Sequence, residues 1–149
     1  MHHLLLSVHV LAAIVFIGGS AVATSLFPRY APLAETAADT APERHPAVAV
    51  VLHRITGTYA RLGLAVPAVG IALAVLQGRM GEIWITLAIV LTACAAAVII
   101  TTIHPMQRQA LEAPDDGRRL RTLGMLAGGY NTLWLIVVVL MIVRPGTAA

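Results

Sequence analysis

The sequence has a single cysteine and no lysine. Cys94 is the only cysteine among 149 residues, so no intramolecular disulfide can form, and its place inside an apolar run favours packing over metal ligation. All ten basic side chains are arginine. Charged residues make up only 11% of the chain and hydrophobic residues 58%, with a mean hydropathy of +0.84. These values exclude an ordinary soluble domain and indicate an integral membrane protein.

Motifs of several common enzyme classes are also absent. The sequence has no glycine-rich phosphate loop, no HExxH, no cysteine pair and no serine-nucleophile motif. The pI near 9.8 requires no nucleic-acid partner, because nine of the ten arginines lie outside the apolar runs and Arg61 lies one turn inside the end of one, where membrane orientation and anionic lipid account for them. Any chemistry must therefore use histidine, methionine, arginine or a few polar groups inside the apolar runs.

Four apolar runs are long enough to cross a bilayer, at about 4–27, 58–77, 83–103 and 123–143. The sequence therefore predicts one domain over residues 1–149, an all-α, antiparallel four-helix transmembrane bundle. We expect the first helix to end at Pro28, the second to kink at Pro67 and the third to stop at His104-Pro105. No basic segment precedes the first run, so we expect it to be retained and not cleaved as a signal peptide.

The arginines predict the orientation. Four lie between Arg29 and Arg61 and four between Arg108 and Arg121, whereas the turn near Arg79 and the carboxyl terminus have one each. The arginine-rich loops are therefore expected in the cytoplasm and both termini outside. A composition rich in alanine and arginine is typical of GC-rich bacterial genomes, which indicates the inner membrane of a bacterium.

His9 is the most informative polar residue in a span, because an imidazole about 8 Å inside the membrane needs a partner. The residues that follow it at helical spacing are small or aromatic: Ala12, Ala13, Phe16, Gly19 and Ser20. Two interpretations stay open. His9 is an axial ligand of haem iron, or it donates a hydrogen bond across a helix interface that Gly18 and Gly19 allow.

His53 and His104 are expected at the cytoplasmic ends of the second and third helices, where they can approach each other as a weaker metal site. His53, Gly57 and Arg61 share one helix face. This cationic face can hold the carboxylates of a porphyrin or the head of an anionic lipid, or it is an ordinary set of interfacial side chains.

Three further features have weaker interpretations. Met141 has a depth similar to that of His9, so it is either an axial counterpart or a core side chain. Asn131 needs a hydrogen-bond partner and is expected to join two helices. A free amino terminus followed by His2 and His3 offers nitrogen ligands for copper or nickel.

Three stretches, "HVLAAIVFIGG…FPRY", "RLGLAVPAVGIALAVLQG" and "LWLIVVVLMIVRPG", resemble a superfamily of small bacterial membrane proteins. It includes the HemJ-type protoporphyrinogen oxidases, the CopD-type copper-resistance domain and an uncharacterised branch to which this chain is similar. The resemblance implies that His9, the "FIGG" from Phe16 and Pro28-Arg29 bind b-type haem. The sequence has Phe16 where tryptophan is usual, Arg144 where lysine is usual, and no histidine pair within the third helix.

Three functions follow as hypotheses. The first is a haem protein for electron transfer or porphyrin-related redox chemistry, with Arg29 and Arg61 near the propionates. The second is a cofactor-free subunit of a homo-oligomer or larger membrane complex, packing through small residues such as Gly18 and Gly19. The third is copper handling.

Overall fold

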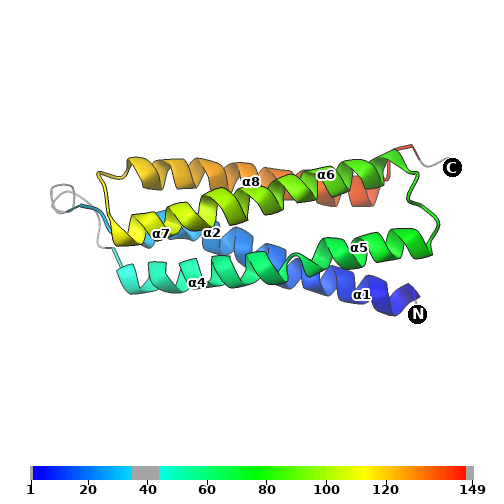
Figure 1. Ribbon diagram of the computed structural model, residues 1–149, viewed down its shortest axis with the longest axis horizontal. Coiled ribbons are helices and arrows are strands. Elements are labelled where there is room, and N and C mark those ends of the chain that lie inside the picture. Colours follow the sequence, from blue (N-terminus) through cyan, green and yellow to red (C-terminus); the bar gives the residue numbers. More distant parts are fainter. Residues whose placement is uncertain (1, 35–43, 147–149) are drawn as a thin grey trace.

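The chain forms a bundle of four long antiparallel helical spans in the computed structural model, which describes residues 2–34 and 44–146 (Figure 1). This confirms the all-α four-helix class. The spans His3–Tyr30, Pro46–Leu76, Ile83–Glu112 and Arg118–Val143 are each long and apolar enough to cross a bilayer. Both termini lie at one end, which we call the termini end (Figure 1). The opposite end, which carries the arginine-rich loops, is called the arginine-rich end.

Three of the spans are built from more than one segment. The first contains α1 (His2–Ala12), the π-helical η1 (Ala13–Gly18) and α2 (Gly19–Tyr30). The second contains α4 (Pro46–Leu62) and α5 (Ala65–Leu76). The third contains α6 (Ile83–Val98), the π-helical η2 (Ile99–Ile103) and α7 (His104–Glu112), and the fourth is α8 (Arg118–Val143).

The first span does not end at Pro28, contrary to the sequence-based expectation. Pro28 lies inside α2, which continues to Tyr30. The last carbonyls of the helix are satisfied by a guanidinium from just before α4: Arg44 Nη1 donates to the carbonyl oxygens of Pro28 at 2.8 Å and of Ala31 at 3.0 Å. These bonds compensate carbonyl groups that a helix end leaves without partners, so the turn around the proline is kept.

The third span also continues past its proline. Pro105 occupies the first turn of α7, directly after the wider turns of η2. Proline has no backbone N–H, and its absence is tolerated in the first turn of a helix. The wider π-helical turns before Pro105 also relieve the contact between its ring and the preceding carbonyl groups. The span therefore runs to Glu112 instead of stopping at His104. This continuation extends α7 alongside α4.

The expected interruption of the second span is present just before Pro67. Pro67 has no N–H to give to the carbonyl of Gly63, and α4 and α5 are separated at Gly63 and Leu64. The Gly63 carbonyl accepts instead from Val66 N at 3.1 Å, while Leu64 N donates to the carbonyl of Arg61 at 3.2 Å. The tighter turn changes the direction of the helix at this level (Figure 1).

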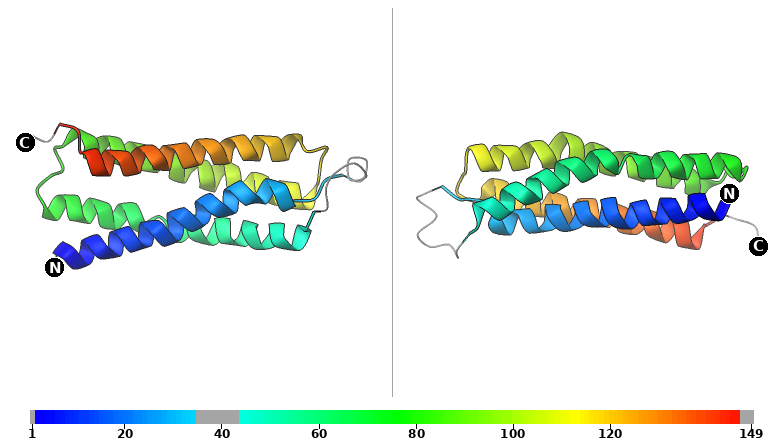
Figure 2. Two further views of the ribbon diagram at one scale, coloured as in Figure 1. Left: turned by 180° about the vertical axis from the view of Figure 1, so that it is seen from behind. Right: turned by 90° about the horizontal axis from the view of Figure 1, so that it is seen from below.

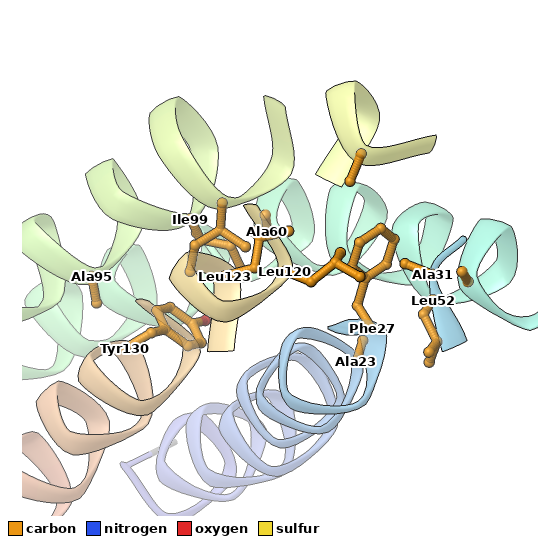
Figure 3. Packing of buried hydrophobic residues seen from close by; sticks show 13 residues of the cluster. Ala23, Phe27, Ala31, Leu52, Ala60, Ala95, Ile99, Leu120, Leu123 and Tyr130 are labelled. Carbon is orange, nitrogen blue, oxygen red and sulfur yellow. The ribbon is translucent and has the colours of Figure 1, made fainter. Parts of the chain in front are cut away.

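The main apolar core lies towards the arginine-rich end. Phe27 of α2 is fully buried and belongs to one cluster with Leu52 of α4 and Leu120 of α8 (Figure 3). Alanines such as Ala23 and Ala49 in this cluster let the helices approach closely. Close packing at this end fixes the relative positions of α2, α4, α7 and α8.

The helices form two pairs towards the termini end. There α1 packs on α5, while α6 packs on α8, and the two pairs diverge (Figures 1 and 2). His9 is the only buried residue of α1 whose side chain the structure describes, and η1 has none. The termini half of the bundle is therefore less tightly packed than the other half.

The fourth span begins after a capped turn. The carboxylate of Asp115 accepts hydrogen bonds from the N–H groups of Gly117 at 2.9 Å and Arg119 at 3.1 Å. Although burial alone acts in the opposite direction, these N–H groups hold the pKa of Asp115 below its usual range. The Asp115 carbonyl also accepts from Ala34 N at 3.0 Å, which joins the two loops of the arginine-rich end.

Candidate functional site

His9 lies between α1 and α5 and is tied to the backbone. Its Nδ1 is 3.0 Å from the carbonyl oxygen of Val66, so Nδ1 carries the proton and donates. The side chain is 8% exposed. Within the described residues Nε2 has no hydrogen-bond partner. It is also not fully enclosed by protein, so it is accessible from outside the bundle. With the Nδ1 proton donated to Val66, Nε2 is the ring nitrogen left for a ligand.

A glycine makes room for this ring. A Cβ built on Gly70 would lie 2.9 Å from Cε1 and 3.4 Å from Nδ1 of His9, closer than side chains normally pack. The absence of a side chain at Gly70 thus lets the imidazole approach the α5 backbone. Both contacts come from α5: the Val66 carbonyl accepts a hydrogen bond from the ring, and the ring lies against the helix surface at Gly70.

The double glycine of the first span has two different environments. A Cβ on Gly19 would overlap the ring of Tyr59 from α4, which also makes an edge-to-face contact with Phe16 at a centroid distance of 5.7 Å. Around Gly18 nothing lies within 4 Å of such an atom. Gly19 therefore allows the first span to pack closely against α4, whereas the helix surface at Gly18 is not covered by another helix.

Gly19→Ala is expected to destabilise the protein by about 1–3 kcal/mol, because the added methyl group displaces the Tyr59 ring. Gly18→Ala is the matched control. It is expected to be neutral or slightly stabilising, since alanine is the better helix former and the site is open. Unfolding of both variants by sodium dodecyl sulfate in mixed micelles measures the difference. Equal losses would contradict the assignment of Gly19 to the interface.

The structure brings His53 and His104 together at the arginine-rich end. Their rings are stacked, with centroids 4.3 Å apart and planes 10° from parallel. The ring of His104 fits where Gly57 has no side chain, since a Cβ there would overlap Nε2. Stacked rings place their nitrogens side by side instead of pointing them at one common atom, so this geometry does not form a two-histidine metal site.

A chain of hydrogen bonds fixes the position of His53. Thr56 Oγ1 donates to the Leu52 carbonyl at 2.9 Å, Gln107 Nε2 donates to Thr56 Oγ1 at 3.3 Å, and Gln107 Oε1 accepts from His53 Nδ1 at 3.2 Å. The single Thr56 proton is used on Leu52, so the amide must present its oxygen to the histidine. The proton of neutral His53 is therefore on Nδ1.

The remaining predicted site residues differ in their positions relative to His9. Arg29 is exposed and follows His9 by 20 residues, or about 30 Å of helix, so it cannot reach a group bound at His9. Arg61 lies close enough to His104 for their charges to interact. Met141 is half-buried on α8, which belongs to the other helix pair. Arg29 and Met141 are therefore not placed at His9, whereas Arg61 precedes Val66, the hydrogen-bond partner of His9, by only five residues.

Several polar groups lie inside the bundle. Tyr130 is 3% exposed, and its hydroxyl is 2.8 Å from Ser20 Oγ. Next to this pair is a cavity of about 20 Å³, room for one water molecule, lined also by Thr92 and by Trp134, whose Nε1 is buried without a partner in the described part of the chain. A cavity of this size does not admit a porphyrin, so a haem would have to bind at the surface of the bundle.

Other polar side chains have less bearing on a site. Asn131 Nδ2 donates to Ser25 Oγ at 2.9 Å, which joins α8 to α2 as expected. Over residues 2–34 and 44–146, no three histidine, cysteine or acidic side chains are grouped to hold a metal ion. The proposed copper site at the amino terminus involves Met1, outside the described residues. Cys94 is exposed on α6.

Sequence analysis missed the groups that hold the histidines. The Val66 carbonyl, Gly70 and Gln107 were not predicted to take part. A backbone carbonyl has no sequence signature, and Gln107 falls in a segment expected to be a loop. A glycine within an apolar run is the one available signal, because glycine opposite a histidine allows a close approach.

Comparisons with known proteins give no match: no family model fits the sequence, and no curated protein or solved structure is similar to it. The class therefore follows from the fold itself. The protein is a multi-pass membrane protein with four helices that can span a bilayer. It has one histidine held in the termini half and a histidine pair near the arginine-rich end.

Proposed function

We propose that the protein binds b-type haem through His9 and uses it for electron transfer or porphyrin-related redox chemistry. The observation that carries this proposal is the hydrogen bond from His9 Nδ1 to the Val66 carbonyl at 3.0 Å. Histidines that ligate metals characteristically donate their other ring N–H to a carbonyl or carboxylate, which fixes the tautomer and directs the free nitrogen. The resemblance of the first span to haem-binding membrane proteins supports the same role.

The residues present fit a haem ligand in their donor chemistry. A neutral imidazole with a free Nε2 is the ligand that haem iron takes, and the Val66 carbonyl makes that nitrogen more electron-rich. A bound haem would supply one-electron redox chemistry. The chain's own contribution is to hold the ring against Gly70 and to keep the site in an apolar environment. Arg29 is not part of this proposal, because it is too far along the helix.

The first test is an absorption spectrum of the full-length protein, purified in mild detergent from haem-sufficient cells. We expect a Soret band and, after reduction with dithionite, a sharpened α band. Titration of the purified protein with haemin provides a second measurement and should saturate at one haem per chain. Absence of both the bands and saturable binding would overturn the proposal.

A cofactor-free subunit is the second candidate, and one observation favours it. Gly124, Gly128 and Gly129 lie on the exposed surface of α8, and nothing lies within 4 Å of a Cβ built on any of them. Glycines four residues apart on a lipid-facing helix allow a second helix to pack closely. A colourless preparation that cross-links as a discrete oligomer, and loses this when Gly128→Leu is introduced, would support this candidate over haem binding.

We also propose that the protein resides in a bacterial inner membrane with the arginine-rich end in the cytoplasm. Eight of the ten arginines belong to that end, and the termini end has Arg79 and Arg144. This distribution is the one that orients multi-pass proteins. A reporter fused to the carboxyl terminus that is active only outside the cytoplasm tests the orientation.

A further inference from the structure

Two arginines and two histidines lie along the surface where α4 packs on α7 near the arginine-rich end. His104 lies in the space left by Gly57, and its ring stacks on His53. Arg61 follows Gly57 by one helical turn, and Arg108 follows His104 by one turn. α4 and α7 run antiparallel (Figure 1). The two arginines therefore flank the histidine pair on opposite sides along the helix contact. We call these four side chains, Arg61, His104, His53 and Arg108, the cationic groove.

The groove has an excess of positive charge. Arg108 Nε is paired with Glu112 Oε1 at 2.8 Å, but both side chains are largely exposed, so this pair is weak. Within the described ranges Arg61 makes no ion pair and no hydrogen bond through its side chain. An anion in the groove would therefore meet a guanidinium without a protein partner.

The depth of Arg61 makes such a partner necessary. Arg61 lies 15 residues before Leu76, where the span ends, which is about 22 Å of helix in a hydrocarbon layer of about 30 Å. A guanidinium about 8 Å inside the hydrocarbon carries a large desolvation cost unless it reaches polar groups. Its long side chain can extend towards the near membrane surface, along the side where His104 lies.

The histidine pair between the two arginines has a fixed position. His53 is held by Gln107, which is fully buried and bonded to Thr56. Towards the termini end, the same helix faces continue with Leu64 and Ile100, which are 46% and 39% exposed. The groove thus changes from cationic to apolar in the direction of the membrane centre.

We propose that the cationic groove binds an anionic phospholipid, with the headgroup phosphate between Arg61 and Arg108 and an acyl chain along Leu64 and Ile100. The positive charge of the two arginines favours a phosphate group. The exposed apolar side chains of Leu64 and Ile100 next to them favour a lipid over a free anion. None of the four side chains of the cationic groove is assigned to haem in the proposed function, so this inference does not rest on haem binding.

The test is native mass spectrometry of the full-length protein, delipidated in detergent and titrated with dioleoyl phosphatidylglycerol. We expect one tightly retained lipid per chain and much weaker retention of dioleoyl phosphatidylcholine. Arg61→Gln and Arg108→Gln should each weaken binding about fivefold, and the double variant about 25-fold. Arg61→Lys keeps the charge and should retain most of the affinity, which separates loss of charge from loss of fold.

Arg29→Gln is the matched control. It removes one exposed arginine from the same end of the bundle but outside the groove, and it should change binding less than twofold. Three outcomes would overturn the proposal: equal binding of phosphatidylcholine, an effect of Arg29→Gln as large as that of Arg61→Gln, or full competition by inorganic phosphate, which would identify a free anion as the ligand. Unchanged binding in the double variant would overturn it as well.

Discussion

Replacing His9 with alanine is expected to abolish the Soret band of the purified protein. The imidazole is the only haem ligand that we assign, and its Nε2 has no other partner in the described residues. Without it, a haem would keep only apolar contacts at the surface of the bundle. The spectra of wild type and variant, prepared from the same haem-sufficient cells, measure the loss.

Two controls separate ligation from folding. His53→Ala removes a histidine at the other end of the bundle and should leave the spectrum unchanged, since His53 is stacked on His104. His9→Gly should recover the band when imidazole is added, because free imidazole can occupy the vacated place. Gly70→Ala, which brings a methyl group against the ring, should weaken haem binding about tenfold. A spectrum that survives His9→Ala would contradict the assignment.

Phe27→Ala is expected to cause the largest loss of stability among single core substitutions, about 3 kcal/mol. Phe27 is 0% exposed and fills the space between α2, α4 and α8 (Figure 3). Its removal leaves a cavity that helices fixed by neighbouring alanines cannot close. Unfolding in mixed micelles with increasing sodium dodecyl sulfate, followed by circular dichroism, gives the change in the free energy of unfolding.

Leu135→Ala is the matched control for this prediction. Leu135 is 64% exposed on α8, so its truncation removes contacts with lipid or detergent instead of core contacts. We expect a change within about 0.5 kcal/mol. Similar losses for Phe27→Ala and Leu135→Ala would show that the cluster near the arginine-rich end does not dominate stability.

The four spans could be predicted from hydropathy alone, because a bilayer requires about 20 apolar residues in each. The helix ends could not. The end of α2 depends on Arg44, which lies 14 residues after Tyr30, and the passage through Pro105 depends on the π-helical turns before it. Local propensity rules describe neither a cap from a side chain distant in the sequence nor a change of helix type.

The contacts of the candidate site could likewise be predicted from the sequence only in part. The spacing of His53 and His104 at helix ends was enough to expect their approach, since antiparallel neighbours bring such ends together. The partner of His9 is a backbone carbonyl 57 residues away, and the position of Arg61 beside His104 depends on the direction in which α4 runs past η2. Such contacts depend on helix rotation and tilt, which hydropathy does not determine.

The interruptions in three of the spans lie near one level of the bundle. η1 lies beside the Gly63–Leu64 break, since Phe16 Cβ is 3.8 Å from a Cβ built on Gly63. η2 is close to this level as well, but its Ile99 and Ile103 are buried members of the apolar cluster. The α1–α5 and α6–α8 pairs diverge on the side of the termini end (Figure 2). Because the regular hydrogen-bond ladder is already broken there, bending at this level costs less than bending elsewhere. The α1–α5 pair can therefore change its distance from the α6–α8 pair by bending at η1 and at the Gly63–Leu64 break, without repacking the apolar cluster near the arginine-rich end.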